Sequence, residues 1–456
     1  MDMMKTKPVE LNRSALGTSE SLIMGIAGTA PAFSLAATIS TLIAAVGVLS
    51  PASLLYSSVV IFGVTLAFVH LTRINASAGG AFTWVGDIFH PALGFLCGWS
   101  LLFSSAIFMV SGSMPAATAT LALFAPDKVA SPVWVTALAA LWLVFVGAIV
   151  VKGIKATSYT QIIFTVVELG ALIAILVAGW FKPGLNVQHP LTSAQFSLAA
   201  FTPSVFVAGA LISLFFFWGW DVAINLNEET QDAESTARPA LFGAMLVTLL
   251  LYMGFTMTTL HVLSDQEISD AGTNVVYVLA EHLFPKPWSY MALVAVTLST
   301  VGNLETSILQ FTRTLFAKSR SGVLPVSFAR LHPHWQTPWV ATLLIVVLGL
   351  VFLFAASFFP TVKIIVADSV NAIGFMVCFY YSLAALACVW YFRKQINSFR
   401  DRLELQIWPG VSGLFLVFIG IRSLPTFDTM TLSLALGGMA AGWLLWVLRQ
   451  RWLAID

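Results

Sequence analysis

Long apolar stretches recur along the whole chain, and charged residues are almost confined to the short segments between them. Of the 456 residues, 58% are hydrophobic and 9% are charged. A soluble domain carries roughly a quarter charged residues, so a water-exposed fold of this composition would lack a polar surface. Lipid accepts an apolar exterior, but only segments that satisfy their own backbone groups can cross it. The pattern therefore predicts an all-α polytopic membrane protein.

A helix that crosses a bilayer needs about 20 apolar residues, and this criterion gives about twelve candidate spans. They fall roughly at residues 21–47, 52–72, 80–122, 132–151, 156–181, 199–226, 239–262, 285–317, 338–357, 361–391, 405–423 and 430–448. The first run is too long for the core of a signal peptide, so we expect it to be retained. We interpret residues 1–456 as one transmembrane domain without an appended soluble part.

The orientation of the spans follows from the basic residues. Most of the 22 Lys and Arg residues, among them Arg73, Lys152 and Arg393, flank the span ends that a cytoplasmic N-terminus would place inside. Basic residues accumulate on the cytoplasmic side of membrane proteins. The sequence therefore predicts a multi-pass protein of the cytoplasmic membrane with both termini in the cytoplasm.

Two predicted spans contain residues that interrupt an α-helix. The first span reads GIAGTAP at residues 25–31, where two glycines and a proline make a continuous helix costly. The sixth reads FWGWD at residues 217–221, with a glycine between two tryptophans and a carboxylate directly after them. A helix break inside the bilayer exposes backbone polar groups and needs a compensating function.

Interrupted helices five spans apart are what an inverted five-plus-five repeat predicts. The first repeat would cover about 21–181, the second about 199–391, and two further helices about 405–448. Exposed N–H groups at the half-helix ends could hold a substrate carboxylate, and free carbonyls could hold an ammonium or a cation. The alternative is that Gly28 and Gly219 only allow close helix packing.

Several further motifs occur in a recognisable order. They are AGGAFTW at residues 78–84, FHPALGFLCGW at 89–99, the FWGWD break running on to NEET at 227–230, and RTLFAKSRSGVLP at 313–325. In this order the chain resembles the amino acid–polyamine–organocation transporters, whose fold is the LeuT-type bundle. The resemblance covers nearly the whole chain and implies twelve helices with helices one and six broken.

The resemblance also implies alternating access around a central site. The site would hold the amine and carboxylate of a substrate at the unwound parts of spans one and six, and an aromatic at the second break would act as a gate. In this sequence those positions are Ile26, Gly28, Thr29, Ala30, Phe217, Trp218, Gly219 and Trp220. Phe217 or Trp218 would be the gating residue, with ordinary packing as the alternative.

One position departs from the family pattern. Proton-coupled relatives often have a lysine in span five where sodium-coupled ones bind an ion, and here that position is Glu168. Ser299 and Thr300 in span eight match the hydroxyl pair that faces the cation. We therefore expect Glu168, Ser299 and Thr300 to form an ion- or proton-coupling site, although a hydrogen-bonded structural acid is the alternative for Glu168.

Ionisable residues inside a membrane are costly and are functional candidates by default. Asp221 is the strongest: it could be the counter-ion of a substrate ammonium, or it could cap the second half of span six. Glu305 and Asp368 are weaker candidates. Glu228 and Glu229, at the inner end of span six, are expected to pair with Arg238 or a neighbouring base and to hold an inner gate.

The sequence therefore predicts a secondary active transporter that moves amino acids or related organic amines, by symport, antiport or exchange. A polyamine or other organic cation bound at Asp221 is the alternative, and a channel is a remote one because a selectivity loop is missing. The chain has no phosphate-binding loop and no metalloprotease or nucleophile motif, which argues against an enzyme. We expect no cofactor, no resident metal and no nucleic acid partner. The expected partners are membrane lipid and a proton or sodium ion, and the expected oligomeric state is a monomer or weak dimer.

Overall fold

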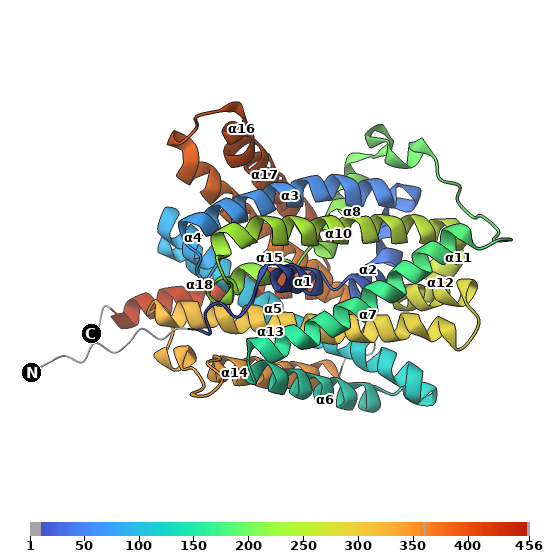
Figure 1. Ribbon diagram of the computed structural model, residues 1–456, viewed down its shortest axis with the longest axis horizontal. Coiled ribbons are helices and arrows are strands. Elements are labelled where there is room, and N and C mark those ends of the chain that lie inside the picture. Colours follow the sequence, from blue (N-terminus) through green and yellow to red (C-terminus); the bar gives the residue numbers. More distant parts are fainter. Residues whose placement is uncertain (1–10, 359–361, 454–456) are drawn as a thin grey trace, which may run out of the picture.

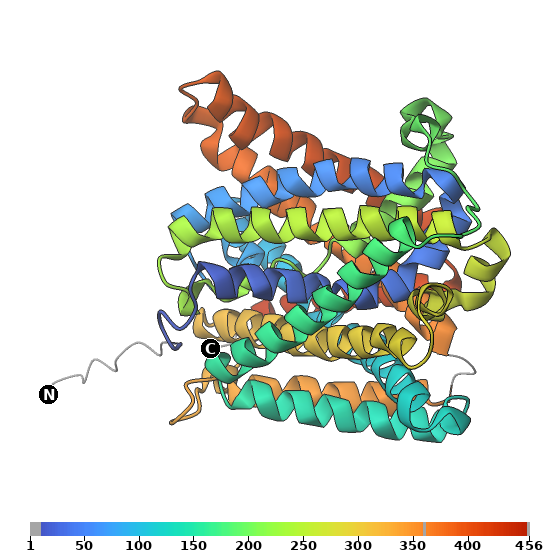
Figure 2. The ribbon, with the colours of Figure 1, turned by 45° about the vertical axis from the view of Figure 1, so that its right-hand side comes forward.

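The computed structural model describes residues 11–358 and 362–453, which fold into a bundle of helices (Figures 1 and 2). The first half contains α1 (Thr18–Thr29), α2 (Pro31–Val46), α3 (Ser50–Ile74), α4 (Ala81–Ile88), α5 (Pro91–Phe124), α6 (Pro132–Val151) and α7 (Ile154–Phe181). The middle contains α8 (Pro203–Phe216), α9 (Val222–Asn225), α10 (Ala233–Val262), α11 (Asp265–Ala271) and α12 (Val275–Leu283). The last part contains α13 (Met291–Arg320), α14 (Trp339–Ala356), α15 (Val362–Tyr391), α16 (Phe399–Arg402), α17 (Trp408–Ser423) and α18 (Thr429–Leu453).

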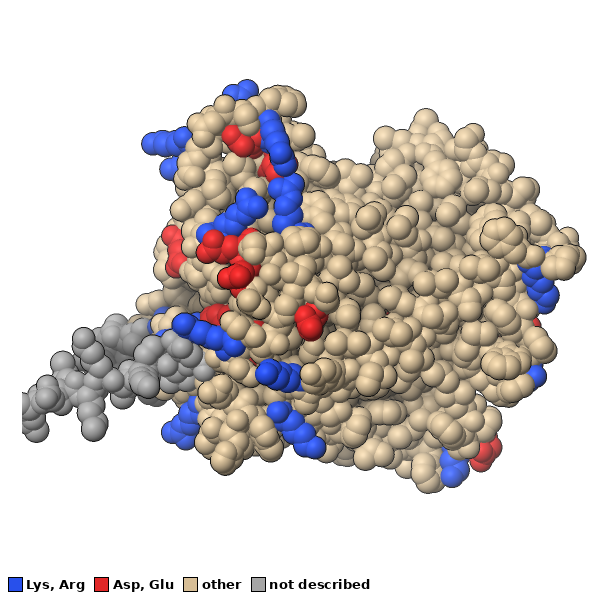
Figure 3. Space-filling view, viewed as in Figure 1, with Lys and Arg blue, Asp and Glu red and all other residues tan. Residues whose placement is uncertain are grey.

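The face of the bundle seen in Figure 3 has the charge distribution of a membrane protein. In Figure 3, Lys, Arg, Asp and Glu gather at the two ends of the bundle, and the belt between them is almost uncharged. Large apolar side chains on the outside of α6 and α7, such as Leu141, Val166 and Ile173, face outward rather than into the protein. Such an exterior suits lipid and confirms the predicted all-α polytopic membrane fold.

Ten helical segments in the described chain are long and apolar enough to cross a membrane. One of them, Thr18–Ile74, contains α1, α2 and α3 together. The apolar helix Pro203–Phe216 is shorter and is not counted among the ten. The predicted number of about twelve spans and the inverted repeat stay predictions.

The third predicted span, 80–122, is two helices in the structure. The short α4 ends at Ile88, and the long α5 begins at Pro91. Proline has no N–H group and cannot continue a preceding helix, but it fits the first position of a new one. The Nδ1 atom of His90 accepts a hydrogen bond from the Ala92 amide at 3.2 Å and caps α5.

The centre of the bundle is formed by α5 and α13, which are the most deeply buried of the candidate spans. The long helix α13 is unusual because many of its buried side chains are polar. They include Ser299, Thr300, Asn303, Glu305, Thr306, Ser307, Gln310 and Arg313. Because polar groups inside a membrane protein need partners, α13 is where a polar site is expected.

The start of the described chain and the end of α18 lie at the same end of the bundle, on the left in Figures 1 and 2. There the amides of Ala15 and Leu16 donate to the carbonyl of Glu229, at 2.8 Å and 3.0 Å. Arg449, near the end of α18, donates to the carbonyl of Gly322, which follows α13.

Candidate functional site

The first break separates α1 from α2 at Ala30. This residue has φ 44° and ψ 71°, a left-handed conformation, and Pro31 opens the new helix. Pro31 cannot donate to the preceding turn, so the helix is interrupted as its sequence predicts. The carbonyl oxygen of Thr29, freed by the break, accepts hydrogen bonds from the hydroxyls of Ser34 at 2.7 Å and Tyr252 at 2.9 Å. Tyr252 belongs to α10 and was not among the predicted site residues.

The second break separates α8 from the short helix α9. Residues 217–221 lie outside both helices, and Gly219 has φ 101°, which favours glycine. Phe217, Trp218 and Trp220 are all buried. Phe217 packs against Tyr252, and Trp218 against Phe108 of α5, so their rings hold the loop in place.

The two breaks touch each other. A methyl group added to Gly28 would lie 2.1 Å from the carbonyl oxygen of Gly219, and one added to Gly219 would lie 2.0 Å from the carbonyl oxygen of Gly28. Any larger side chain would clash with backbone atoms, so both positions need glycine for close approach. This packing role, left open by the sequence, brings the two broken helices to one point in the bundle.

Glu168 of α7 lies at the amino end of α2. Its Oε1 atom accepts a hydrogen bond from the Ala32 amide at 2.7 Å, and the side chain is 1% exposed. The hydroxyl oxygen of Ser299 accepts from the next amide, that of Phe33, at 3.1 Å. The first amides of a helix attract negative charge, so Glu168 and Ser299 together cap α2 from two other helices.

Thr300 does not join this arrangement, because its hydroxyl donates to the carbonyl of Val296 within α13. Of the three predicted coupling residues, Glu168 and Ser299 therefore meet at one helix end, whereas Thr300 bonds to its own helix.

Asp221 is buried and held by three neutral donors. Its Oδ1 atom accepts from Gln310 Nε2 and from the Tyr381 hydroxyl, each at 3.0 Å, and its Oδ2 atom accepts from the Tyr380 hydroxyl at 2.9 Å. Trp218 Nε1 donates in turn to the Tyr380 hydroxyl at 3.1 Å. Asp221 stands at the capping position of α9, but its side chain makes no capping hydrogen bond in the described chain. The carboxylate instead ties the second break to α13 and α15.

Two ion pairs join α13 to the turn that follows α9. Arg313 and Glu229 are both fully buried and share two hydrogen bonds, at 2.9 Å and 3.0 Å. Arg320 pairs with Glu228, whose Oε1 atom also accepts from the Ala78 amide. Of the two expected alternatives, Arg238 is wrong, because it pairs with Glu404, and other bases, Arg313 and Arg320, are the partners. The bases come from α13 because its end lies beside the turn after α9.

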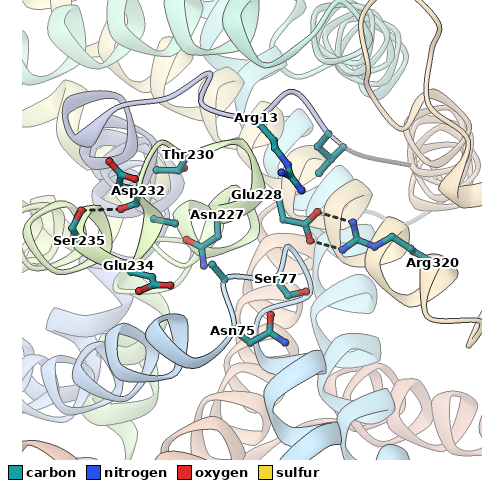
Figure 4. A pocket seen from close by; sticks show the side chains of 13 residues that line it. Arg13, Asn75, Ser77, Asn227, Glu228, Thr230, Asp232, Glu234, Ser235 and Arg320 are labelled. Carbon is teal, nitrogen blue, oxygen red and sulfur yellow. Dashed lines mark hydrogen bonds and ion pairs between the residues drawn. The ribbon is translucent and has the colours of Figure 1, made fainter. Parts of the chain in front are cut away.

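A cavity of about 1000 Å³ opens at this end (Figure 4). It is lined by polar and charged side chains, including Arg13, Asn227, Glu228, Asp232 and Arg320, and the Glu228–Arg320 pair lies in its wall. The Arg313–Glu229 pair does not line this cavity and is fully buried.

The sequence missed the partners that surround the breaks: Tyr252, Gln310, Arg313, Tyr380 and Tyr381. The adjacent tyrosines and the arginine do stand out inside apolar spans, and polar residues there are candidates by default. Their targets could not be read from the sequence, since Tyr380 and Asp221 are far apart along the chain.

The comparisons with known proteins agree on a family. The model of the amino acid permease family matches residues 16–448. The chain is 25% identical to the serine/threonine exchanger SteT of Bacillus subtilis, over 82% of this chain and 82% of that protein. It is 24% identical to the low-affinity putrescine importer PlaP of Escherichia coli, over 79% and 77%. It is 23% identical to the human large neutral amino acids transporter small subunit 2, over 79% and 66%.

Proposed function

Because the chain belongs to the amino acid permease family, we propose that this membrane transporter moves an amino acid by alternating access around its two broken helices. The observation that supports this best is the meeting of the breaks at Gly28 and Gly219. It gathers the free ends of α1, α2, α8 and α9 at one place, where helix dipoles can bind both charges of an amino acid. The LeuT-type repeat is part of this proposal.

The substrate site in this proposal lies at the two breaks. The first break contributes the backbone of Ile26, Gly28, Thr29 and Ala30. The second contributes the backbone and side chains of residues 217–221. The amides at the start of α2 are the natural place for the substrate carboxylate, because a helix amino end favours an anion. In the structure those amides are bonded to Glu168 and Ser299.

This geometry supplies a mechanism for proton coupling. A substrate carboxylate that binds the amide of Ala32 must displace the Glu168 carboxylate, since two anions cannot share one donor. A proton on Glu168 removes that competition, so substrate and proton enter together and one carboxylate occupies the start of α2 before and after. Ser299 keeps the second amide occupied while the exchange takes place. The coupling ion of this proposal is therefore the proton rather than sodium.

The test is uptake by purified protein in proteoliposomes. Counterflow with radiolabelled serine should be competed by other neutral amino acids and not by putrescine. Uptake by the wild type should rise when the outside is made acidic, and a sodium gradient should have no effect. If no amino acid competes, the amino acid assignment is wrong.

Glu168→Gln is the decisive variant. The neutral side-chain amide competes less strongly than a carboxylate for the backbone amide of Ala32. The hydrogen bond that an ionised Glu168 makes there contributes about 1.5–3 kcal/mol. We expect an apparent affinity higher by roughly tenfold, the factor that corresponds to about 1.4 kcal/mol. Uptake should no longer depend on pH. An unchanged pH profile would refute the coupling role and leave the amino acid assignment standing.

An organic cation is the second candidate substrate. It is favoured by Asp221, a carboxylate that is 2% exposed and bonded to uncharged donors, and by the similarity to a putrescine importer. If putrescine competes in the same counterflow assay and Asp221→Asn abolishes that competition, Asp221 is the counter-ion of the substrate. Competition by neutral amino acids alone would exclude this candidate.

A further inference from the structure

A second buried carboxyl group, Glu305, lies between α13 and α7 and has no role in the proposed transport site. The side chain is 1% exposed. Its Oε2 atom accepts a hydrogen bond from Gln161 Nε2 of α7 at 2.6 Å. Its Oε1 atom is buried and has no hydrogen-bond partner among the described residues. Glu305 therefore accepts from one donor, because the nearby Thr157 hydroxyl donates instead to the carbonyl of Gly153 at 3.2 Å.

Two other buried carboxylates of this protein accept more hydrogen bonds than Glu305 does. Glu229 is fully buried too, and Arg313, on the same helix as Glu305, neutralises it with two hydrogen bonds. Asp221 accepts three hydrogen bonds. Burying an unpaired charge is far more costly than burying a neutral polar group. Glu305 has neither a cationic partner, as Glu229 has, nor three hydrogen bonds, as Asp221 has, and an ionised carboxylate needs such compensation.

Gln161 cannot supply a second donor to Glu305. Its Nε2 group has two hydrogens, and they are used on Glu305 and on the carbonyl of Gly302, at 2.8 Å. The opposite orientation of the amide would place its oxygen against the Gly302 carbonyl oxygen. With this orientation fixed, Gln161 Oε1 is itself buried and unpartnered in the described chain. Among the described residues, the site thus has two unpartnered acceptors, and the one further nearby hydroxyl, that of Thr157, is used on the Gly153 carbonyl.

The charged and titratable groups around the site are engaged elsewhere. On the elements that pack against α13, these groups are Glu20 of α1, Cys97 of α5, Lys155, Tyr159 and Glu168 of α7, Tyr277, Glu281 and His282 of α12, and Tyr290 of the turn before α13. Tyr277 bonds to Glu281, and His282 bonds to Glu267. Glu20 bonds to the Gly17 amide and Glu168 to the Ala32 amide, whereas Lys155 and Tyr159 point to the exterior. Among the described residues, none of these groups pairs with Glu305.

We propose that Glu305 and Gln161 form a proton-binding site, in which the carboxyl group of Glu305 is held as the neutral acid. The proton on Oε1 turns an unpartnered acceptor into a donor and removes the uncompensated charge. The oxygen Oε2 becomes the carbonyl oxygen that accepts from Gln161. A sodium ion would need several oxygen ligands at once, whereas the site offers two unpartnered ones.

The site continues the polar face of α7. Thr157, Gln161, Thr165 and Glu168 are spaced by three or four residues, so they share one face of the helix, and all are buried. Glu305 lies further along α13 toward Arg320 than Ser299 does. The proton site therefore lies on the same helix–helix contact as Glu168, toward the end with the ion pairs. It exists whether or not Glu168 couples transport, so the inference goes beyond the proposed function.

Infrared difference spectroscopy of the purified full-length protein at neutral pH tests the proposal. A protonated carboxyl group has a C=O stretching band separate from that of a carboxylate. Glu305→Gln should remove one such band relative to the wild type. Glu267→Gln, a change of a half-exposed glutamate on α11, should not. Gln161→Leu should keep the band but shift it to higher frequency, because the C=O loses its amide donor.

Two results would overturn the proposal. One is a folded Glu305→Gln protein, judged by gel filtration and circular dichroism, whose protonated-carboxyl region equals that of the wild type. The other is a band that changes when sodium chloride replaces choline chloride at constant pH, which would assign the site to sodium. Should Glu305→Gln fail to fold, the Gln161→Leu spectrum decides: an unshifted band refutes the site. These readouts need no uptake assay, so they are independent of the test on Glu168.

Discussion

At the scale of single residues, the contact between Gly28 and Gly219 depends most directly on side-chain identity. Each glycine faces a backbone carbonyl of the other, and a carbonyl cannot rotate away as the end of a flexible side chain can. Gly219 also has a positive φ that a β-carbon disfavours. The contact between the two broken helices is therefore intolerant of even one added methyl group.

Gly28→Ala is expected to push the two breaks apart and to destabilise the protein by about 1–3 kcal/mol, the usual cost of overpacking. Gly219→Ala should destabilise the protein more than Gly28→Ala does, because it adds backbone strain. Thermal unfolding in detergent and amino acid uptake measure the effect. The control is Gly170→Ala on α7, where an added methyl meets nothing within 4 Å. Wild-type stability and uptake in Gly28→Ala would contradict this account.

At the scale of elements, the short helix α11 is held at its start by a reciprocal cap. Ser264 N and Oγ donate to Glu267 Oε2, at 2.9 Å and 2.7 Å, and Glu267 Oε1 lies 3.0 Å from His282 Nε2 of α12. The hydrogen bond from the Ser264 backbone, followed in importance by the one from its hydroxyl, holds the pKa of Glu267 below its usual value of 4.5. Glu267 thus links the two helices that follow α10.

Acid should loosen this pair of helices. Because the pKa of Glu267 is lowered by folding, its contribution to stability is present above pH 4.5 and is lost as the pH falls through the lowered value. Hydrogen exchange of residues 265–283, corrected for intrinsic rates, should therefore speed up under acid. Glu267→Gln should show fast exchange already at pH 7, since the amide carries no charge.

Asp270→Asn is the matched control for this experiment, because Asp270 is on the same helix and bonds to Gln266. It should leave exchange at pH 7 unchanged. Equal exchange in the wild type and Glu267→Gln at pH 7 would show that the cap does not stabilise α11.

At the scale of the whole molecule, the charged ends define which surfaces face water, but not which end faces the cytoplasm (Figure 3). The loop after α7 is bonded to the end of α10, through Gln188 and His261. The loop after α13 is bonded to the end of α6 just before α7, through Thr337 and Val151. The two loops therefore mark opposite ends of α7.

Cysteine labelling can assign the two ends. All three native cysteines are buried, so they should give little background with a membrane-impermeant maleimide. If both termini are cytoplasmic, Asn186→Cys should be labelled on intact cells, and His334→Cys only after permeabilisation. Both positions are exposed. The reverse pattern would refute the predicted orientation.

The sequence by itself determined the features that depend on local chemistry. Apolar runs gave the membrane helices, because a chain segment in lipid must be apolar and satisfy its own backbone. Pro31 and Gly219 placed both breaks, because proline lacks a donor and glycine permits positive φ. At His90 and Pro91 the local chemistry was misread: residues 80–122 were predicted as one span, and the structure begins a new helix at Pro91.

Only the tertiary structure decided which groups meet. Asp221 could be singled out as an ionisable residue, but its bonds to Gln310, Tyr380 and Tyr381 depend on how α13 and α15 are turned toward the break. Glu168 was predicted as a coupling group, yet its place on the amide of Ala32 comes from the packing of α7 against α1, the helix that ends just before α2. A partner for a buried charge is set by the faces that distant helices present, and no local pattern encodes that choice.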